Sequence, residues 1–219
     1  MLGDRDPAEF ACAMDLQRLL HGFGADGNDL IDIGRQRQAL LPDTAFVSPH
    51  APEPCAGAPH GRQWFGLTFR DPGERWRGVA QARPLLDRFL DDELARHSLE
   101  AGDMALVGFS QGTMMALHAG LRRRPALAGI VGYSGILVTP PGKDPAALTL
   151  PADPPPVLLV HGDQDQVIPP PALAFSVEEL KALNVPVGSH LSRGVGHGID
   201  ATGLRLGGEF LVTIFRKAA

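Results

Sequence analysis

One serine lies in a pentapeptide that is typical of a catalytic nucleophile. Gly108, Ser110 and Gly112 form the pattern G-x-S-x-G within the segment GFSQG. An apolar run, MALVGF, leads into it, and a helical pattern, QGTMMALHAGLRRR, follows. A sharp turn from strand to helix presents a serine hydroxyl at the top of a sheet, and glycines on either side permit close packing. The alternative is an ordinary turn in which Ser110 caps the helix. The flanking patterns favour the nucleophile.

A serine nucleophile needs a base, which in α/β-hydrolases follows the serine and the acid along the chain. Beyond the helix that follows Ser110, the chain contains His161, His190 and His197. His161 directly follows an apolar strand pattern and precedes the acidic candidates, and His190 lies inside another strand pattern. His197 lies in the glycine-rich loop GVGHG, from which an imidazole can reach across the top of a sheet. We therefore predict that His197 is the base.

Two aspartates compete for the role of the acid that orients the base. Asp163 and Asp165 both follow the apolar run VLLV, in the segment HGDQDQVIP. Asp165 precedes an apolar pair and Pro169, which would hold the loop in place. Asp163 follows Gly162 and could instead accept backbone N–H groups that stabilise the turn. The residues alone favour Asp165 only slightly.

The segment LLHGFGADGND supports two different interpretations. Gly22, Gly24 and Gly27 match the dinucleotide-binding pattern G-x-G-x-x-G. That pattern also requires an acidic residue at the end of the second strand, about 20 residues further on. Asp43 has a suitable spacing but precedes its strand, and His21 and Phe23 would be bulky beside a pyrophosphate. The alternative is a tight loop that carries a backbone N–H to the serine, and we favour it over an NAD-dependent oxidoreductase.

Short apolar runs alternate with helical patterns along the chain. Strands are predicted at Thr44–Ser48, Met104–Phe109, Leu127–Tyr133, Val157–Val160 and Val185–Leu191, and helices at Glu74–Arg96, Gln111–Arg123, Pro171–Leu183 and Ala201–Arg216. This alternation predicts a single α/β domain over residues 1–219, with a mostly parallel sheet covered by helices on both faces. The strand before the glycine loop, within Met14–Leu20, is the weakest prediction, because Asp15 and Arg18 are unfavourable in a central strand.

Four motifs in order, HGFGADGNDL, GFSQG, HGDQDQVIP and GVGH, resemble those of the carboxylesterases grouped with acyl-protein thioesterases and lysophospholipases. The run SPHAPEPCAGAPHGRQWF is similar to one in the bacterial esterases called family VI. The resemblance implies an α/β-hydrolase fold and a catalytic triad of Ser110, Asp165 and His197. It further implies that the backbone N–H groups of Phe23 and Gln111 form the oxyanion hole, without a metal or cofactor. Members usually have an antiparallel strand pair and a more apolar strand before the His-Gly loop, so we expect an altered amino-terminal sheet edge.

The same resemblance suggests which residues line the acyl site. These are Trp64, Phe65, Ile136, Leu137, Val167 and Ile168. For Trp64 and Phe65, ordinary core packing is an equally good interpretation. The chain has few residues to spare for a large helical lid, which favours esters with short or medium acyl chains. A lysophospholipase or acyl-thioesterase with the same triad is the alternative within this mechanism, and a non-catalytic binding protein is an alternative outside it.

Composition and the chain's first residues argue against several classes of binding partner and location. A formal net charge of −5 argues against a dedicated nucleic-acid binder. The two cysteines, Cys12 and Cys55, cannot form a disulfide framework or a zinc cluster, and we favour two free thiols over a single bridge between them. The acidic start MLGDRDPAEF is unlike a signal peptide, and no apolar run approaches the ~20 residues of a membrane span. These features predict a cytoplasmic enzyme that acts on small-molecule esters, and they are compatible with a homodimer.

Overall fold

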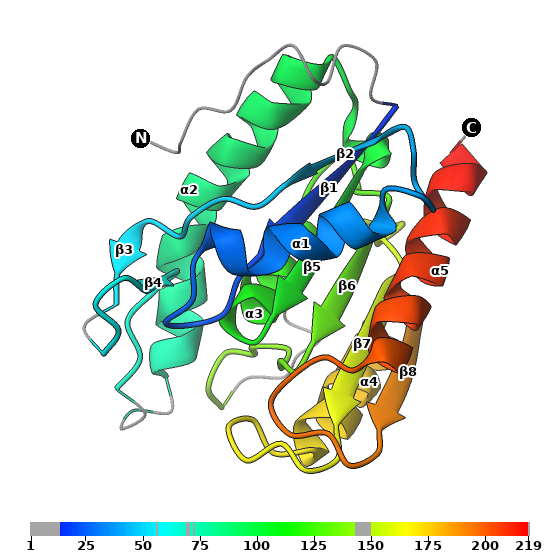
Figure 1. Cartoon of the computed structure of the whole chain (residues 1–219). Helices are drawn as coiled ribbons and strands as arrows, with labels where there is room; N and C mark the ends of the chain where they lie inside the picture. Colours follow the sequence, from blue (N-terminus) through cyan, green and yellow to red (C-terminus); the bar gives the residue numbers. More distant parts are fainter. Residues whose placement is uncertain (1–13, 56, 69–70, 72, 143–149, 219) are drawn as a thin grey trace.

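Six parallel strands form the central sheet of the computed structural model, in the order β2-β1-β5-β6-β7-β8 (Figure 1). The structure describes residues 14–55, 57–68, 71, 73–142 and 150–218. The strands are β1 (Asp15–Leu20), β2 (Thr44–Val47), β5 (Met104–Phe109), β6 (Gly129–Tyr133), β7 (Val157–Gly162) and β8 (Val187–Ser192). Each strand begins and ends within two residues of its prediction. Buried apolar runs define the inner strands, whereas the edge strand β8 is largely exposed.

Helices cover both faces of this sheet, as the alternation of patterns predicted (Figure 1). They are α1 (Gly27–Arg37), α2 (Glu74–His97), α3 (Gln111–Gly120), α4 (Pro171–Ala182) and α5 (Ala201–Ala218), with a short 3₁₀ helix, η2, at Ala101–Asp103. One apolar core contains side chains of α2, α3 and α4, and the other contains side chains of α1 and α5. The α/β fold class is therefore confirmed.

Helix α1 and the antiparallel pair β3 (Glu53–Pro54) and β4 (Arg62–Gln63) were not predicted. The sequence of α1, GNDLIDIGRQR, is mostly polar and contains two glycines, which lower its intrinsic helix propensity. Its capping box is nevertheless complete, because the Asp26 carboxylate accepts the N–H of Asn28, and the Asp29 carboxylate accepts the N–H of Asp26. The predicted helix Gln111–Arg123 extends too far, since α3 ends at Gly120.

Strand β1 lies inside the sheet, between β2 and β5, although its sequence made it the least convincing strand. Leu16, Leu19 and Leu20 are fully buried, which supplies the apolar contacts that a central strand needs. Arg18 is also fully buried, and its guanidinium forms an ion pair with Glu93 of α2. The sheet therefore accommodates this cation by providing a carboxylate on the neighbouring helix. In the described residues, the amino-terminal side of the sheet consists of β1 and β2, which are parallel.

Of the two cysteines, Cys55 is buried and free, whereas Cys12 lies outside the described residues. The whole segment MLGDRDPAEF also lies outside them, so the prediction about a signal peptide stays a prediction. Among the helices in the described part of the chain, none is both long enough and apolar enough to cross a membrane.

A buried histidine on α3 predicts how stability depends on pH. The ring of His118 packs edge-on against Trp76, with a centroid distance of 5.3 Å. Burial lowers the pKa of His118 to about 3, and the charges of Arg122 and Arg83 act in the same direction. The unfolded chain therefore binds a proton at this histidine near pH 6.5, whereas the folded chain does not.

Because of this difference, the contribution of His118 to stability is complete above pH 6.5 and decreases as the pH falls towards 3. Between pH 6.5 and about pH 5, we expect the wild-type free energy of unfolding to fall by about 2 kcal/mol more than that of His118→Leu. Urea unfolding at both pH values measures this difference. Parallel pH profiles for the two proteins would contradict the assignment.

Candidate active site

Ser110 lies in a strained turn between β5 and α3. Its φ of 54° and ψ of −115° fall outside the regions that residues other than glycine favour. A Cβ at Gly108 would overlap the backbone of Gly112, and a Cβ at Gly112 would overlap the carbonyl of Leu20. Both glycines of the G-x-S-x-G pattern are therefore required by close backbone packing. The Ser110 N–H donates to the Tyr133 carbonyl at 2.9 Å, which ties the turn to β6.

The loop between β8 and α5 brings His197 to this serine. His197 Nε2 lies 3.0 Å from Ser110 Oγ, and His197 Nδ1 lies 2.8 Å from Asp165 Oδ2. The Phe109 ring packs against the imidazole, with a centroid distance of 5.0 Å. Ser134, which follows β6, donates from its hydroxyl to the Gly198 carbonyl at 2.9 Å. The structure thus places the three predicted triad residues in one chain of hydrogen bonds.

Asp165 is buried at the carboxyl end of β7. Its Oδ1 accepts the backbone N–H groups of Val167 and Ile168, both at 2.9 Å, which leaves Oδ2 for His197. Burial raises the pKa of Asp165, but the hydrogen bonds from His197, Ile168 and Val167 together outweigh it and lower the pKa below its ordinary value. The carboxylate therefore stays ionised, in the state that can accept a hydrogen bond from His197.

The other candidates for acid and base occupy supporting positions. Asp163 is exposed, and its Oδ1 accepts the N–H of Gly194 at 2.7 Å, which joins its turn to the loop before His197. This is the turn-stabilising role that was the alternative for Asp163. His161 is buried, and its Nε2 lies 2.8 Å from the Ile168 carbonyl and 3.3 Å from Asp165 Oδ2. His161 therefore supports the loop that carries Asp165.

The glycine loop after β1 lies against the serine. A Cβ at Gly22 would come within 3.3 Å of Ser110 Cβ and 3.1 Å of the Phe109 ring, so a side chain here would require these neighbours to shift by a few tenths of an ångström. Gly22 to Ala25 form a turn that is closed by a 3.3 Å hydrogen bond from the Ala25 N–H to the Gly22 carbonyl. Within the described residues, the N–H groups of Phe23 and Gln111 have no hydrogen-bond acceptor. Both amides are therefore available to a ligand at Ser110.

The same loop is unsuitable for a pyrophosphate. The Asp26 carboxylate accepts the N–H of Asn28 at 2.6 Å, so a negative charge already occupies the amino end of α1. The Gly27 N–H donates to Nδ1 of His50 at 3.1 Å. A dinucleotide phosphate requires these N–H groups to be free and would be repelled by the carboxylate. The match to the dinucleotide pattern is a coincidence of glycine spacing.

The family model described as Phospholipase/Carboxylesterase matches residues 18–215. The chain belongs to the phospholipase/carboxylesterase family. Family membership also confirms the sequence-based prediction of a carboxylic ester hydrolase.

Two curated relatives carry names that agree with this family. The esterase YpfH of Escherichia coli K12 is 29% identical over 189 residues, which cover 86% of this chain and 78% of the relative. Acyl-protein thioesterase 1 of Schizosaccharomyces pombe is 31% identical over 155 residues, which cover 68% of each chain. Among solved structures, esterase PE8 has a TM-score of 0.86 at 42% identity, with 94% of both chains covered. SOBER1 of Arabidopsis thaliana, at 21% identity and a TM-score of 0.73, shows the same fold over 94% of this chain and 99% of its own.

The residues predicted to line the acyl site of this family member lie in different environments. Val167, which follows Asp165, is 57% exposed, whereas Ile168 is buried. After β6, Ile136 is half-buried against the core, and Leu137 is buried with its N–H donating to Ser176 Oγ at 2.9 Å. Of these residues, only Val167 presents a large exposed apolar surface near the triad.

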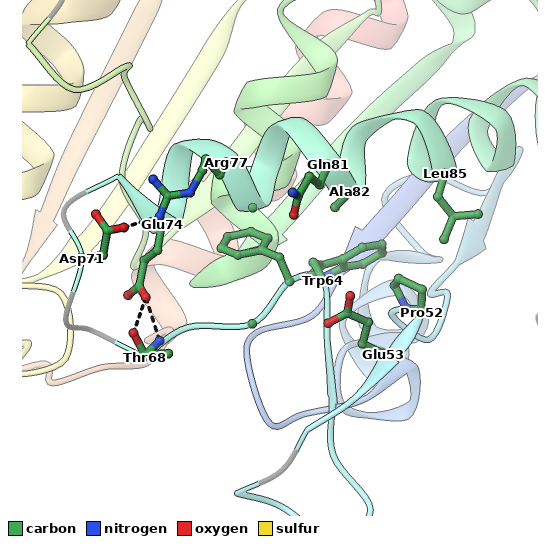
Figure 2. A pocket seen from close by; sticks show the side chains of 13 residues that line it. Pro52, Glu53, Trp64, Thr68, Asp71, Glu74, Arg77, Gln81, Ala82 and Leu85 are labelled. Carbon is green, nitrogen blue, oxygen red and sulfur yellow. Dashed lines mark hydrogen bonds and ion pairs between the residues drawn. The ribbon is translucent and has the colours of Figure 1, made fainter.

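Trp64 and Phe65 are also buried, which agrees with the core-packing interpretation. Both line a cavity of about 540 Å³ between α2 and the segments around β3 and β4 (Figure 2). The lining of this cavity includes none of the triad residues. Trp64 and Phe65 instead contact the site through Gln111, whose side chain hydrogen bonds to their backbone.

Sequence reasoning missed several residues that hold the site in place. These are His21, His161, Ser134 and the side chain of Gln111. Each lies in or beside a predicted motif, but local patterns do not identify its partner, so its role could not be read from them. In the described part of the chain, no group of three or more His, Cys, Asp or Glu side chains is arranged to hold a metal ion.

Proposed function

We propose that this protein is a serine carboxylesterase that hydrolyses esters with short or medium acyl chains. The observation that carries the proposal is the position of His197, which lies 3.0 Å from Ser110 Oγ and 2.8 Å from Asp165 Oδ2. In this arrangement, a neutral His197 donates from Nδ1 to Asp165 and accepts the Ser110 proton at Nε2. That division of roles is what nucleophilic catalysis by serine requires.

Hydrolysis would proceed in two stages. Ser110 Oγ attacks the acyl carbonyl as His197 Nε2 takes its proton, and the carbonyl oxygen becomes an oxyanion. The N–H groups of Phe23 and Gln111 bind this oxyanion, with one donor worth on the order of 3 kcal/mol. The intermediate collapses, and the leaving alcohol takes the proton from His197. Water, deprotonated by His197, then attacks the acyl-enzyme and releases the carboxylic acid and free Ser110.

Hydrolysis of p-nitrophenyl acetate and butyrate tests the proposal. We expect the wild-type protein to hydrolyse both esters and Ser110→Ala to fall to the background rate, because the alanine cannot form an acyl-enzyme. If both proteins are inert, the non-catalytic alternative is favoured. If both are equally active, Ser110 is not the nucleophile.

A comparison of substrates addresses the alternative within this mechanism. A series of p-nitrophenyl esters of increasing acyl length, measured beside an acyl-CoA and a lysophospholipid, compares the chemical classes directly. We expect kcat/KM to be highest for the short and medium esters. A higher value for the acyl-CoA or the lysophospholipid would assign the chain to thioester or lysophospholipid hydrolysis instead. The cytoplasmic location, the homodimer and the independence from cofactors stay predictions.

A further inference from the structure

Three hydrogen bonds connect Trp64 and Phe65 to both sides of the candidate oxyanion hole. The indole Nε1–H of Trp64 donates to the His21 carbonyl at 2.9 Å, on the loop that carries Phe23. The backbone N–H of Trp64 donates to Gln111 Oε1 at 2.9 Å. The side-chain amide of Gln111 then donates to the Phe65 carbonyl at 2.8 Å. One short segment therefore binds the loop after β1 and the turn after β5 at the same time.

This bridge is needed because the strand ladder ends before the two amides. The last paired residues of β1 and β5 are Leu20 and Gly108. Beyond this pair, in the part of the chain that the structure describes, no backbone hydrogen bond joins Gly22 or Phe23 to Ser110 or Gln111. The separation of the two N–H groups thus depends on contacts outside the sheet.

His21 holds the first of these loops in a defined conformation. Its Nδ1 lies 2.8 Å from the Gly22 carbonyl, and the N–H of Ala51 donates to its Nε2 at 2.9 Å. A carbonyl only accepts, so the ring proton resides on Nδ1 and the imidazole is neutral. Burial lowers the pKa of His21, which agrees with this neutral form. The ring of Trp64 lies beside it, with a centroid distance of 5.6 Å.

A cavity lies beside Trp64, between its segment and α2. The cavity of about 540 Å³ has Trp64 on one wall and Ala82 and Leu85 of α2 on another (Figure 2). Trp64 is itself only 4% exposed, so packing and hydrogen bonds both hold it in place. Packing is not directional, whereas the hydrogen bonds from the indole Nε1–H and the backbone N–H fix which loop atoms Trp64 contacts.

We propose that Trp64, the side chain of Gln111 and His21 form a clamp that sets the separation between the N–H groups of Phe23 and Gln111. We call these three residues the Trp64 clamp. The proposal rests on the proposed function, since it concerns the oxyanion hole of that reaction. The members of the clamp are positioning residues: Trp64 acts through His21 and Gln111, and the Gln111 side chain acts through its own backbone. An oxyanion exists only after attack, so a loosened clamp weakens the transition state more than substrate binding.

The sharpest test removes one hydrogen-bond donor from the clamp. Trp64→Phe deletes the indole Nε1–H that donates to the His21 carbonyl and retains an aromatic ring. We expect kcat per active site to fall about 10-fold with KM within about 3-fold of wild type, because loss of a whole oxyanion donor costs about 10²- to 10³-fold. Active-site titration with a fluorophosphonate counts the reactive Ser110. Trp76→Phe is the matched control, because this indole packs against His118 and Arg122 and outside the clamp.

A second variant tests the other end of the clamp. Gln111→Met keeps the backbone N–H and removes both side-chain hydrogen bonds to Trp64 and Phe65. We again expect a selective decrease in kcat.

For both variants, the inhibition constant of an alkyl boronic acid, which forms a tetrahedral adduct with Ser110, should rise by the same factor by which kcat/KM falls. A purely structural role would lower the thermal midpoint and the titrated fraction while kcat per titrated site stayed unchanged.

Each possible result of these experiments either supports or overturns the proposed clamp. A selective decrease in kcat in both variants, matched by weaker boronate binding and absent in Trp76→Phe, supports the clamp. A kcat per titrated site within 2-fold of wild type in either variant overturns it. If neither variant contains titratable Ser110, these residues are needed for folding and the proposal is also overturned. Failure of the proposed function would differ from all of these, because wild type and Ser110→Ala would then behave alike.

Discussion

Replacing Asp165 by asparagine is expected to lower kcat about 10⁴-fold, because it reverses the tautomer of the base. In the structure, Asp165 Oδ1 accepts the N–H groups of Val167 and Ile168, and Oδ2 faces His197 Nδ1 at 2.8 Å. An asparagine would keep its oxygen on the two N–H groups and turn its NH₂ towards His197. The imidazole would then carry its proton on Nε2 and could not accept the proton of Ser110. Steady-state kinetics with p-nitrophenyl butyrate measure the loss.

Asp163→Asn provides the matched control, because it makes the same chemical change two residues away. Asp163 is exposed and accepts the Gly194 N–H, which an asparagine oxygen can also accept. We expect its kcat to stay within about 3-fold of wild type. A large loss in Asp163→Asn together with a small loss in Asp165→Asn would show that the acid had been assigned to the wrong aspartate.

The second large effect concerns stability and the buried ion pair between β1 and α2. Arg18 of β1 is fully buried, and its guanidinium pairs with Glu93 of α2 and lies 5.7 Å from the centre of the Phe89 ring. Burial lowers the pKa of Arg18 to about 9, whereas Glu93 acts in the opposite direction, so the guanidinium is charged at neutral pH. Glu93→Ala would leave this charge buried without its partner. We expect the free energy of unfolding to fall by about 3–5 kcal/mol in urea.

The double variant Arg18→Met/Glu93→Leu removes both partners of the ion pair. Its free energy of unfolding therefore shows the cost of losing the pair without the added cost of an unpaired buried charge. Removing both charges leaves no ion to solvate, and apolar side chains of similar size can fill the space. We expect its stability to lie within about 1 kcal/mol of wild type or above it. If Glu93→Ala costs less than about 1 kcal/mol, Arg18 must reach another partner or solvent, and the account of how β1 tolerates a cation fails.

Most of the fold could be predicted because most of its strands are buried on both faces. Such strands are continuous apolar runs, and turns that contain glycine or proline mark their ends, as in Met104–Phe109. Helix α1 was missed for the opposite reason, since it is mostly polar and its stability depends on its cap and on packing of Gly34 against Phe46. Strand β1 was uncertain because Arg18 is unfavourable there until Glu93, 75 residues later in the chain, is brought beside it.

Local sequence determined the types and the order of the proposed triad residues, because a strained strand-to-helix turn and a glycine-rich loop leave recognisable residues. It favoured Asp165 over Asp163 only slightly, since both follow the same strand and have the same chemistry. Only the tertiary structure directed Asp165 towards His197 and Asp163 towards Gly194. It also decided the roles of His21, Trp64 and the Gln111 side chain, whose partners come from segments up to 47 residues apart. Such contacts are set by how the loops pack above the sheet, and no periodicity in the sequence records that packing.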